Sequence, residues 1–401
     1  MKIDTMEIDT MVLKKKVLNG NWNYPTQIRF GVGRIDELGK ACVSIGLKNP
    51  LLVTDKGLYD LPIVEQAKQS CLKEKLGIEL FKEVDPNPTG ENISAGVQAY
   101  RDGQHDGVIA FGGGSSLDAG KAIALMVGQT RPLWDFEDIG DNWTQVIEDK
   151  MAAVIAIPTT AGTGSEVGRA SVIRDVAKQQ KKIIFHPKML PTLVIADPEL
   201  TVGLNAKVTA ATGMDALSHN LEALCVPGFH PLADGIAKEG VGLIKNWLSL
   251  AVKEPGNLQA RSYMLAASLM GATAFQKGLG AMHALSHPLG ALYDAHHGLL
   301  NAVLMPYVLK HNEKAIAASM AQLALVLELK SASFSAVLDW VLSLREEIGI
   351  PHSLLEMDIG KDRLIELANM AEQDPSSGGN PIKMDAKQYV SILSNAIDGT
   401  L

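Results

Sequence analysis

Cysteine is scarce in this chain, and its scarcity limits the kinds of site the chain can form. The 401 residues include three cysteines, Cys42, Cys71 and Cys225, and none of them belongs to a CxxC pair. A disulfide framework or a thiolate zinc site is therefore not expected, and the composition suits a reducing cytosol.

Two further absences concern charge and hydropathy. Lys and Arg number 37 against 45 Asp and Glu, so the net charge is −8, and no basic block is present. The electrostatic basis for binding nucleic acid or an anionic membrane is therefore missing. No run approaches the roughly 20 apolar residues of a transmembrane helix. The N-terminal segment also lacks the apolar core of a signal peptide, and we expect a cytoplasmic protein.

The pattern of apolar residues indicates two domains, as the length of the chain also suggests. From residue 27 to about 198, continuous apolar runs such as "GVIAF" and "AAVIAIP" alternate with amphipathic stretches. Such alternation is typical of a parallel α/β sheet covered on both faces. After Pro198 helical periodicity dominates. We therefore predict an α/β domain in residues 1–198, an all-helical domain in residues 199–401, and a ligand site between them.

Two glycine-rich segments follow apolar runs in the first domain. "VIAFGGGSSLDAGKAIA" places Gly113 and Gly114 between a predicted strand and a predicted helix, where backbone N–H groups can approach a phosphate. The segment is neither a GxGxxG fingerprint nor a Walker loop, and a tight turn explains it equally well. A second segment, "IPTTAGTGSE", favours phosphate binding because it combines glycines with the hydroxyls of Thr159, Thr160 and Thr163.

Asp55 ends an apolar run in "LLVTDKGL". A carboxylate at the end of an early strand can accept hydrogen bonds from an adenosine ribose, and it would repel a 2′-phosphate. This position favours NAD over NADP. An aspartate that serves only as a turn or helix cap is the alternative interpretation.

Four of the ten histidines fall within the segment "AMHALSHPLGALYDAHHGLL". His283 and His287 are four residues apart, as are Asp215 and His219 in "GMDALSHNLEA", so each pair shares one face of a helix. One such pair alone is commonly structural, but two pairs together with His297 favour a metal site. Without thiolates, Fe(II), Zn(II) or Mn(II) would suit it. The absence of HExxH argues against a zinc peptidase.

Taken together, these segments resemble the iron-containing (group III) alcohol dehydrogenase family. "GGGSSLDAGKA", "IPTTAGTGSEV", "ADPELT", "GMDALSH" and "HALSHPLGALYDAHHG" occur in the family's order and spacing. The resemblance implies a dehydroquinate synthase-like fold, with an α/β dinucleotide-binding domain and an all-α metal-binding domain. It also implies an NAD-dependent alcohol dehydrogenase or aldehyde reductase. Hydride would pass between a metal-bound primary alcohol or diol and nicotinamide C4. A homodimer or larger homo-oligomer is expected as well.

The resemblance also implies the roles of individual residues. The metal, Fe(II) with Zn(II) as the alternative, would be held by Asp215, His219, His283 and His297. His287 would be the non-ligand histidine that relays the substrate proton. The implied cofactor contacts are Asp55, Asn87, Gly113, Gly114, Ser115, Asp118, Thr159, Thr160, Thr163 and Lys181.

Two positions depart from the family pattern. Gly168 stands where many members have a threonine, which removes one hydroxyl near the cofactor. His296 precedes the His-Gly pair at a position that is often proline. It is either a spare ligand or, as we expect, a residue behind the ligands or at the surface.

Three other functions stay open from the sequence. A zinc-dependent polyol dehydrogenase of glycerol type is the closest rival. A lyase on the dehydroquinate synthase-like scaffold is the second, although the apolar segment "HALSHPLGALY" lacks the basic residues that a phosphorylated sugar acid would need. The third is a metal-binding or nucleotide-sensing protein without catalysis.

Overall fold

A six-stranded parallel sheet organises the first half of the chain. In the computed structural model, which describes residues 26–401, the strands follow the order β1-β8-β5-β4-β2-β3. They are β1 (Gln27–Phe30), β2 (Leu51–Asp55), β3 (Glu79–Val84), β4 (Gly107–Gly112), β5 (Ala153–Pro158) and β8 (Leu193–Ala196). Strands β4, β5 and β8 are buried along nearly their whole length, because helices cover both faces of the sheet.

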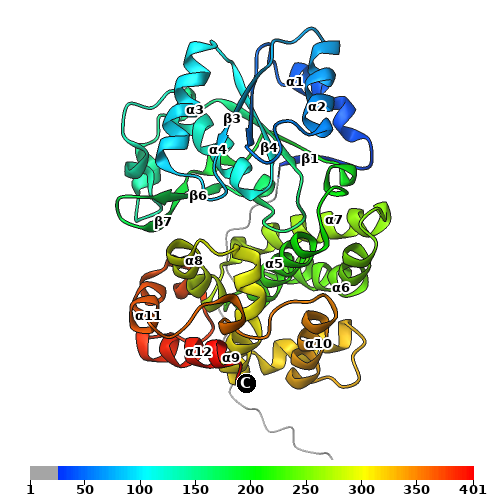
Figure 1. The fold of residues 1–401 in the computed structure, drawn as a ribbon, viewed down its shortest axis with the longest axis vertical. Helices are drawn as coiled ribbons and strands as arrows, with labels where there is room; N and C mark the ends of the chain where they lie inside the picture. The colour runs from blue at the N-terminus through cyan, green and yellow to red at the C-terminus, as the bar shows by residue number, and fades with distance from the viewer. Residues whose placement is uncertain (1–25) are drawn as a thin grey trace, which may run out of the picture.

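Alternate residues of the strands pack against different helices. In β4, Ile109 and Phe111 join the apolar cluster of α1 (Leu38–Ser44) and α2 (Pro62–Lys73). Val108 and Ala110 belong instead to the cluster that includes α3 (Gly90–Asp102) and α4 (Gly114–Met126). Successive side chains of a strand point to opposite faces, so one apolar run builds two layers of core. Figure 1 shows these two pairs of helices on opposite sides of the sheet.

A two-stranded antiparallel hairpin, which the sequence analysis did not predict, follows the loop after β5. It consists of β6 (Ala170–Asp175) and β7 (Gln180–Phe185), paired from Ala170 opposite Phe185 to Asp175 opposite Gln180. The hairpin packs on α4 and extends towards α8 (Ala281–Tyr293). It therefore reaches from the sheet to the helical part of the molecule (Figure 1).

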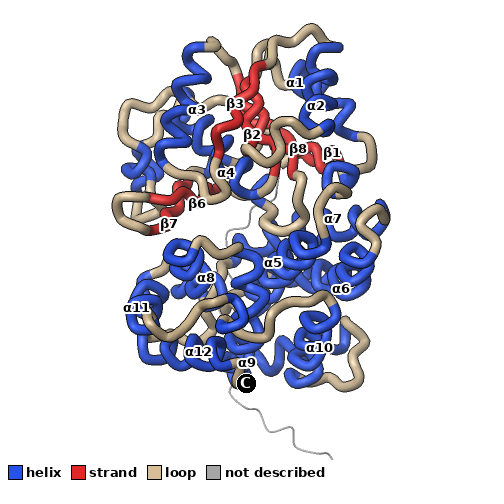
Figure 2. Tube along the Cα trace, in the orientation of Figure 1, coloured by secondary structure: helices blue, strands red, loops and turns tan. Residues whose placement is uncertain are grey.

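The second half of the chain is helical. Besides α8 it contains α5 (Ala206–Cys225), α6 (Pro231–Lys253), α7 (Leu258–Ala274), α9 (His297–Val326), α10 (Phe334–Glu347), α11 (Leu364–Gln373) and α12 (Ala386–Asp398). Residues 199–401 contain no strand, and Figure 2 shows the strands confined to the other part of the molecule. Helix α5 contacts α6, α7 and α9, and its middle is buried on every side.

The predicted fold class is therefore confirmed, with an α/β part followed by an all-α part. Residues 1–25 of the first predicted domain lie outside the described residues. Within residues 26–401, no helix has both the length and the hydropathy that crossing a membrane requires.

Candidate metal and cofactor site

Loops at the carboxyl edge of the sheet contact the helical part directly. The loop after β5 approaches α5 and α7 so closely that two of its positions exclude a side chain. A Cβ at Gly162 would lie 2.7 Å from the Cβ of Thr212 in α5. A Cβ at Gly164, where φ is +61°, would lie 2.2 Å from the Cβ of Ala272 in α7. Glycine is therefore required at both positions, and the threonine-rich loop is seated on the two helices.

The four predicted metal ligands come together beneath this loop. Asp215 and His219 lie on one face of α5, His283 lies in the first turn of α8, and His297 is the first residue of α9. One ligand atom from each of Asp215, His219 and His283 lies within 4.8 Å of the other two. Nε2 of His297 lies 3.8 Å from Oδ1 of Asp215. Three helices therefore deliver one carboxylate and three imidazoles to the same place.

Burial and nearby charges together set the pKa values of these imidazoles. Burial lowers the pKa of His219 to about 4. Burial and the neighbouring imidazoles hold the pKa of His297 well below its usual value. At His283 burial also acts to lower the pKa, but the nearby carboxylates of Glu222 and Asp215 together outweigh it, and the net pKa is raised. Metal binding needs the neutral form of histidine, which burial favours at His219 and His297. One carboxylate and three imidazoles are a donor set that fits a divalent first-row ion.

One further imidazole atom supports this fit. Nδ1 of His219 is buried and makes no hydrogen bond of normal geometry among the described residues, although the backbone of Gly162 lies near enough to oppose the effect of burial on the pKa of this ring. A buried nitrogen without a partner is costly unless another group satisfies it. A metal ion bound within the cluster would fix the orientation of this ring and offset part of that cost.

Asn301 also belongs to this cluster, although the sequence analysis missed it. Its side chain is fully buried, and Nδ2 donates to Oδ1 of Asp215 at 2.9 Å. The same nitrogen lies 3.2 Å from Nε2 of both His283 and His297. Asn301 follows His297 by four residues in α9, and this helical spacing is the signal that could have identified it.

His287 lies beside the ligands and is held by a distant carboxylate. Nδ1 of His287 donates to Oδ2 of Asp374 at 2.8 Å, and its ring stacks on that of His297 with centroids 5.5 Å apart. Burial acts to raise the pKa of Asp374, but His287 and Ser376 together lower it by more. The net pKa is below its usual value, so the carboxyl is ionised near neutral pH. An ionised carboxylate only accepts, so Nδ1 of His287 carries the proton in this bond.

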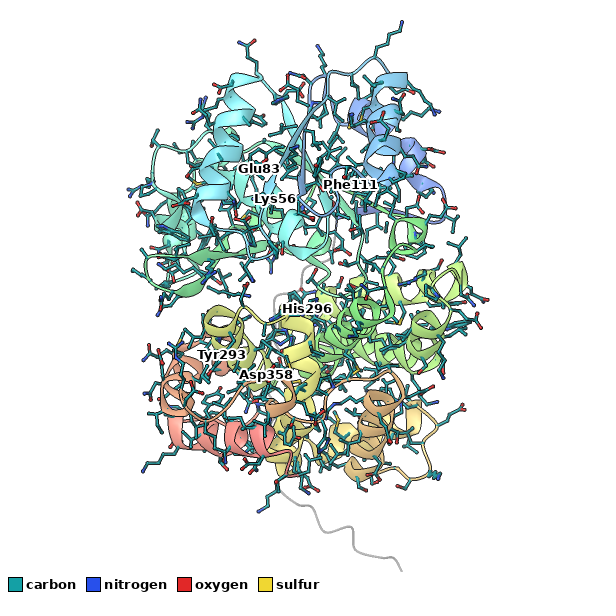
Figure 3. All side chains as sticks on the ribbon, viewed as in Figure 1. Lys56, Glu83, Phe111, Tyr293, His296 and Asp358 are labelled. Carbon is teal, nitrogen blue, oxygen red and sulfur yellow. The ribbon has the colours of Figure 1, made fainter. Side chains whose placement is uncertain are left out.

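His296 has a local structural role. It precedes α9 as the N-cap, and its Nδ1 accepts from the backbone N–H of Leu299 at 3.3 Å. Figure 3 labels it where the helical part faces the sheet part. The bond to Leu299 supports the expectation that His296 does not ligate the metal.

The predicted pyrophosphate loop meets the threonine-rich loop at the carboxyl edge of the sheet. A Cβ at Gly113 would lie 3.3 Å from Cγ2 of Thr160, and one at Gly114 would lie 2.7 Å from Cγ2 of Thr163. Thr159 is buried at the start of the second loop. Because α4 begins at Gly114, the N–H groups of its first turn lie at this junction.

Asp55 and Ser115 lie next to the same loop. Asp55 is the last residue of β2, and its Oδ2 accepts from the hydroxyl of Ser116 at 2.8 Å. The hydroxyl of Ser115 donates to the carbonyl oxygen of Pro86, in the segment that also holds Asn87. These hydrogen bonds connect the first turn of α4 to the end of β2 and to the segment after β3.

Asp118 is bound by protein groups. Its Oδ1 accepts from the hydroxyl of Ser165, and its Oδ2 accepts from the backbone N–H of Val172 at 3.0 Å. Nζ of Lys121 lies 3.3 Å from Oδ1. The carboxylate thus joins α4 to β6 and to the 3-10 turn η5 (Ser165–Val167). Its direct contact with a cofactor stays a prediction.

Asn87 and Lys181 both reach the helix that carries His283. Nδ2 of Asn87 donates to Oδ1 of Asp294, the residue after α8, at 2.6 Å. A Cβ at Gly290 of α8 would lie 3.2 Å from Nζ of Lys181 in β7. Burial lowers the pKa of Lys181 to about 8, although Asp294 opposes this effect. The two side chains therefore connect the sheet part to α8.

Gly168 is not required for steric reasons. The nearest atoms to a Cβ at this position would be the carbonyl oxygen of Ser165 at 3.5 Å and Nζ of Lys121 at 3.7 Å. A threonine would fit at the backbone, so the departure from the family pattern changes the available hydroxyl groups rather than the path of the loop.

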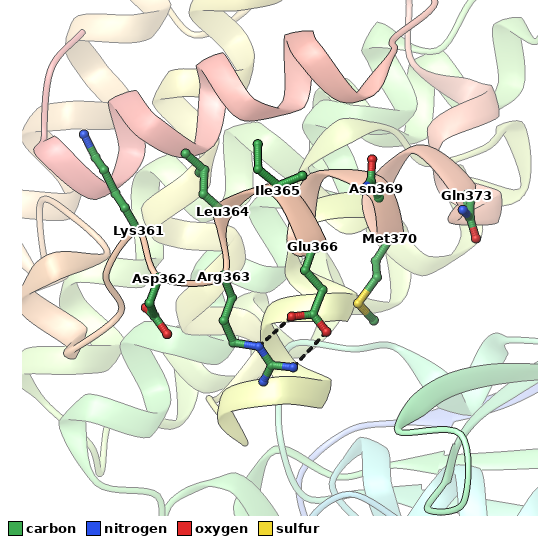
Figure 4. Close-up of a pocket in the computed structure, with 9 residues that line it drawn as sticks. All are labelled: Lys361, Asp362, Arg363, Leu364, Ile365, Glu366, Asn369, Met370 and Gln373. Carbon is green, nitrogen blue, oxygen red and sulfur yellow. Dashed lines mark hydrogen bonds and ion pairs between the residues drawn. The ribbon is translucent and has the colours of Figure 1, made fainter.

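A surface groove of about 550 Å³ runs along the outer side of α11 (Figure 4). None of the predicted site residues lines it. Its two cations are both paired, Lys361 with Asp398 at 2.5 Å and Arg363 with Glu366 at 2.7 Å. We therefore assign no ligand to this groove.

Comparison with known proteins identifies the family. Residues 25–198 match the sequence model "Iron-containing alcohol dehydrogenase", and residues 209–397 match "Fe-containing alcohol dehydrogenase family, C-terminal". The chain belongs to the iron-containing alcohol dehydrogenase family.

Individual relatives match nearly the whole chain. A 4-hydroxybutyrate dehydrogenase of Cupriavidus necator is 37% identical over 386 residues, which cover 93% of this chain and 99% of that protein. An NAD-dependent methanol dehydrogenase of Bacillus methanolicus is 33% identical over 384 residues, or 94% and 100% of the two chains. A crystal structure of 1,3-propanediol oxidoreductase has a TM-score of 0.90 at 33% identity and covers 94% of this chain and 99% of that one.

These comparisons confirm the predicted family and the predicted enzyme class, an NAD-dependent alcohol dehydrogenase. The three alternatives that the sequence left open, a polyol dehydrogenase, a lyase and a non-catalytic sensor, are not favoured.

Proposed function

We propose that this protein interconverts a small primary alcohol or diol and the corresponding aldehyde, with NAD as the hydride carrier and Fe(II) at its metal centre. The observation that carries this proposal is the convergence of Asp215, His219, His283 and His297 directly below the loop that contains Gly162. The proposed metal site would therefore adjoin the proposed nucleotide site.

Each part of the site has a separate task. Asp215, His219, His283 and His297 would hold the metal. When bound, the metal would supply Lewis acidity that lowers the pKa of the alcohol hydroxyl, and NAD would supply the hydride acceptor. The protein's own contribution is to hold both groups in place and to keep His219 and His297 neutral.

His287 would move the substrate proton. Because Nδ1 of His287 donates to Asp374, Nε2 carries the lone pair that can accept a proton from the alcohol. A positive charge on this imidazole would be stabilised by the ionised Asp374. In aldehyde reduction the same Nε2 would return the proton.

The loops would bind the nucleotide. The backbone N–H groups near Gly113, Gly114 and Ser115 would receive the pyrophosphate at the start of α4, supported by the positive charge of Lys181. Thr159, Thr160, Thr163, Asn87 and Asp118 would complete or support this surface. Asp55 would accept hydrogen bonds from the adenosine ribose and repel a 2′-phosphate, which selects NAD.

Further parts of the proposal concern the whole protein. Residues 1–198 would form the cofactor domain and residues 199–401 the metal domain. The protein would be cytoplasmic, form a homodimer or larger homo-oligomer, and bind neither nucleic acid nor membranes. Zn(II) is the alternative metal, because one carboxylate and three imidazoles accept several first-row ions.

The test is the absorbance of NADH after the purified, metal-stripped protein is mixed with NAD and a panel of alcohols and diols. Fe(II), Zn(II) or no metal is added back. We expect turnover to return with metal and to require a primary alcohol. Absence of NADH formation under every condition would overturn the proposal.

A further inference from the structure

Helix α8 begins in a buried environment without a side-chain cap of its own. Its N-cap is Gly280, which has no side chain to accept a hydrogen bond. The first N–H groups of a helix have no partner within the helix, and burying them unpaired is costly. In this structure, partners from other parts of the chain supply the acceptors.

Glu222 in α5 is the main acceptor. Its Oε2 accepts from the backbone N–H of Gly280 at 2.9 Å, and its Oε1 accepts from that of Met282 at 2.7 Å. Oδ1 of Asn380 lies 3.3 Å from the intervening N–H of Ala281. A carboxylate at this position also interacts favourably with the positive end of the helix dipole.

The same carboxylate holds His283. Nδ1 of His283 donates to Oε2 of Glu222 at 2.6 Å, and both side chains are buried. Because Nδ1 carries the proton in this bond, Nε2 keeps its lone pair, and Nε2 is the atom that lies 3.2 Å from Nδ2 of Asn301 in the cluster. Glu222 also follows Asp215 and His219 on one face of α5, so a single helix supplies two ligands and this support.

Apolar packing is incomplete behind Glu222. A cavity of about 10 Å³ lies there, lined by Glu222, Gly280 and Asn380 among other residues. A space of this size holds about one water molecule.

We propose that Glu222 is a positioning residue of the metal centre, which fixes both the first turn of α8 and the tautomer of His283 so that Nε2 of His283 faces the metal. This inference rests on the proposed metal centre. A carboxylate that orients a metal-binding imidazole in this way commonly contributes 10- to 100-fold to metal affinity.

The variant Glu222→Gln tests the proposal with almost no change in volume. An amide has one acceptor oxygen, so its NH₂ group must face either the N–H of Met282 or the donors of Gly280 and His283. We expect metal-stripped Glu222→Gln to bind Zn(II) about 10- to 100-fold more weakly than the unchanged protein, as measured by competition with a chromophoric chelator.

Asp197→Asn is the matched control. Asp197 is also fully buried and accepts from three backbone N–H groups, those of Gly33, Ile35 and Glu199, but it bonds no histidine. We expect this variant to lower the thermal midpoint of the metal-free protein and to leave its Zn(II) affinity unchanged. Glu222→Asp, which keeps both oxygens but shortens the side chain, should restore part of the affinity and serves if Glu222→Gln does not fold.

The possible outcomes distinguish an error about the role of Glu222 from an error about the metal centre itself. If Glu222→Gln loses thermal stability but keeps the Zn(II) affinity of the unchanged protein, Glu222 has only a structural role and the inference is wrong. An equal loss of affinity in Asp197→Asn would have the same meaning. If the unchanged protein itself binds no Zn(II) or Fe(II), the proposed metal centre fails instead.

Discussion

The two halves of the candidate site are built in different ways. The metal half consists of side chains on α5, α8 and α9, and Asp215, His219 and His283 are each at most 4% exposed. The cofactor half consists largely of glycine backbone and short hydroxyl side chains in loops at the edge of the sheet. Chemistry carried by side chains at helical spacing can be recognised in a sequence. Chemistry carried by backbone N–H groups leaves only glycines, which turns also require.

The largest expected effect comes from removing a ligand. His283→Ala should abolish stable metal binding and turnover, because only two imidazoles and a carboxylate would remain as ligands and Glu222 would lose one of its hydrogen bonds. NAD binding should persist, since the cofactor loops do not include this residue. Elemental analysis after gel filtration measures bound metal, and a separate titration measures the affinity for NAD. His219→Ala should behave alike, and an inactive variant that retained its metal would contradict the ligand assignment.

The second prediction compares two histidines near the metal ligands, one proposed to transfer a proton and one with a structural role. His287→Gln should keep the metal but lower kcat by about 10²- to 10⁴-fold, because it removes the group that accepts the proton. His296→Gln is the control and should keep kcat near that of the unchanged protein, since His296 only caps α9. The test is to measure kcat by steady-state kinetics in samples of both variants whose metal content is known. Equal kcat values in the two variants would show that His287 has no part in proton transfer.

The third prediction concerns the contact between the halves. Gly162→Ala would place a methyl group 2.7 Å from the Cβ of Thr212, and we expect it to lower the free energy of unfolding by about 1–3 kcal/mol. It should also weaken NAD binding, because the threonine-rich loop must move. Gly203→Ala is the control, since a Cβ there would meet no atom within 4 Å. Urea unfolding and NAD titration test both effects, and equal behaviour of the variants would mean that the loop is not seated as described.

The smallest expected effect is a dependence on pH in the cofactor half. Burial lowers the pKa of Lys181 to about 8, so its positive charge is present below that pH and is lost above it. Bound pyrophosphate favours the charged form, so the Kd for NAD should rise above pH 8, by at most about tenfold per pH unit. Lys181→Arg should flatten this profile, because arginine stays protonated. A pH-independent Kd in the unchanged protein would show that the charge of Lys181 does not contribute to NAD binding.

The sequence predicted the metal ligands better than the residues that hold the histidines in place. Asp215 and His219 could be paired from spacing alone, and the apolar runs around Val108 and Ile155 predicted the central strands correctly. The hairpin of β6 and β7 was missed, because its charged, lysine-rich residues do not form the apolar runs by which the buried strands were recognised.

The supports were missed for a different reason. Asp374 lies 87 residues from His287, and no periodicity connects these two side chains, which meet through the packing of α8 against α11 and against the 3-10 turn η10 (Pro375–Gly379). Glu222 carried a helical signal, but one that many surface glutamates share. Long-range hydrogen bonds of this kind become visible only once the helices are placed.

The most direct test of the central claim is a titration of the metal-stripped protein with Fe(II), in which bound metal and the rate of NADH formation are followed in the same samples. The account predicts that activity rises in proportion to bound metal and reaches its maximum at one ion per chain. Full activity before any metal is added, or saturation of the site without NADH formation, would contradict it.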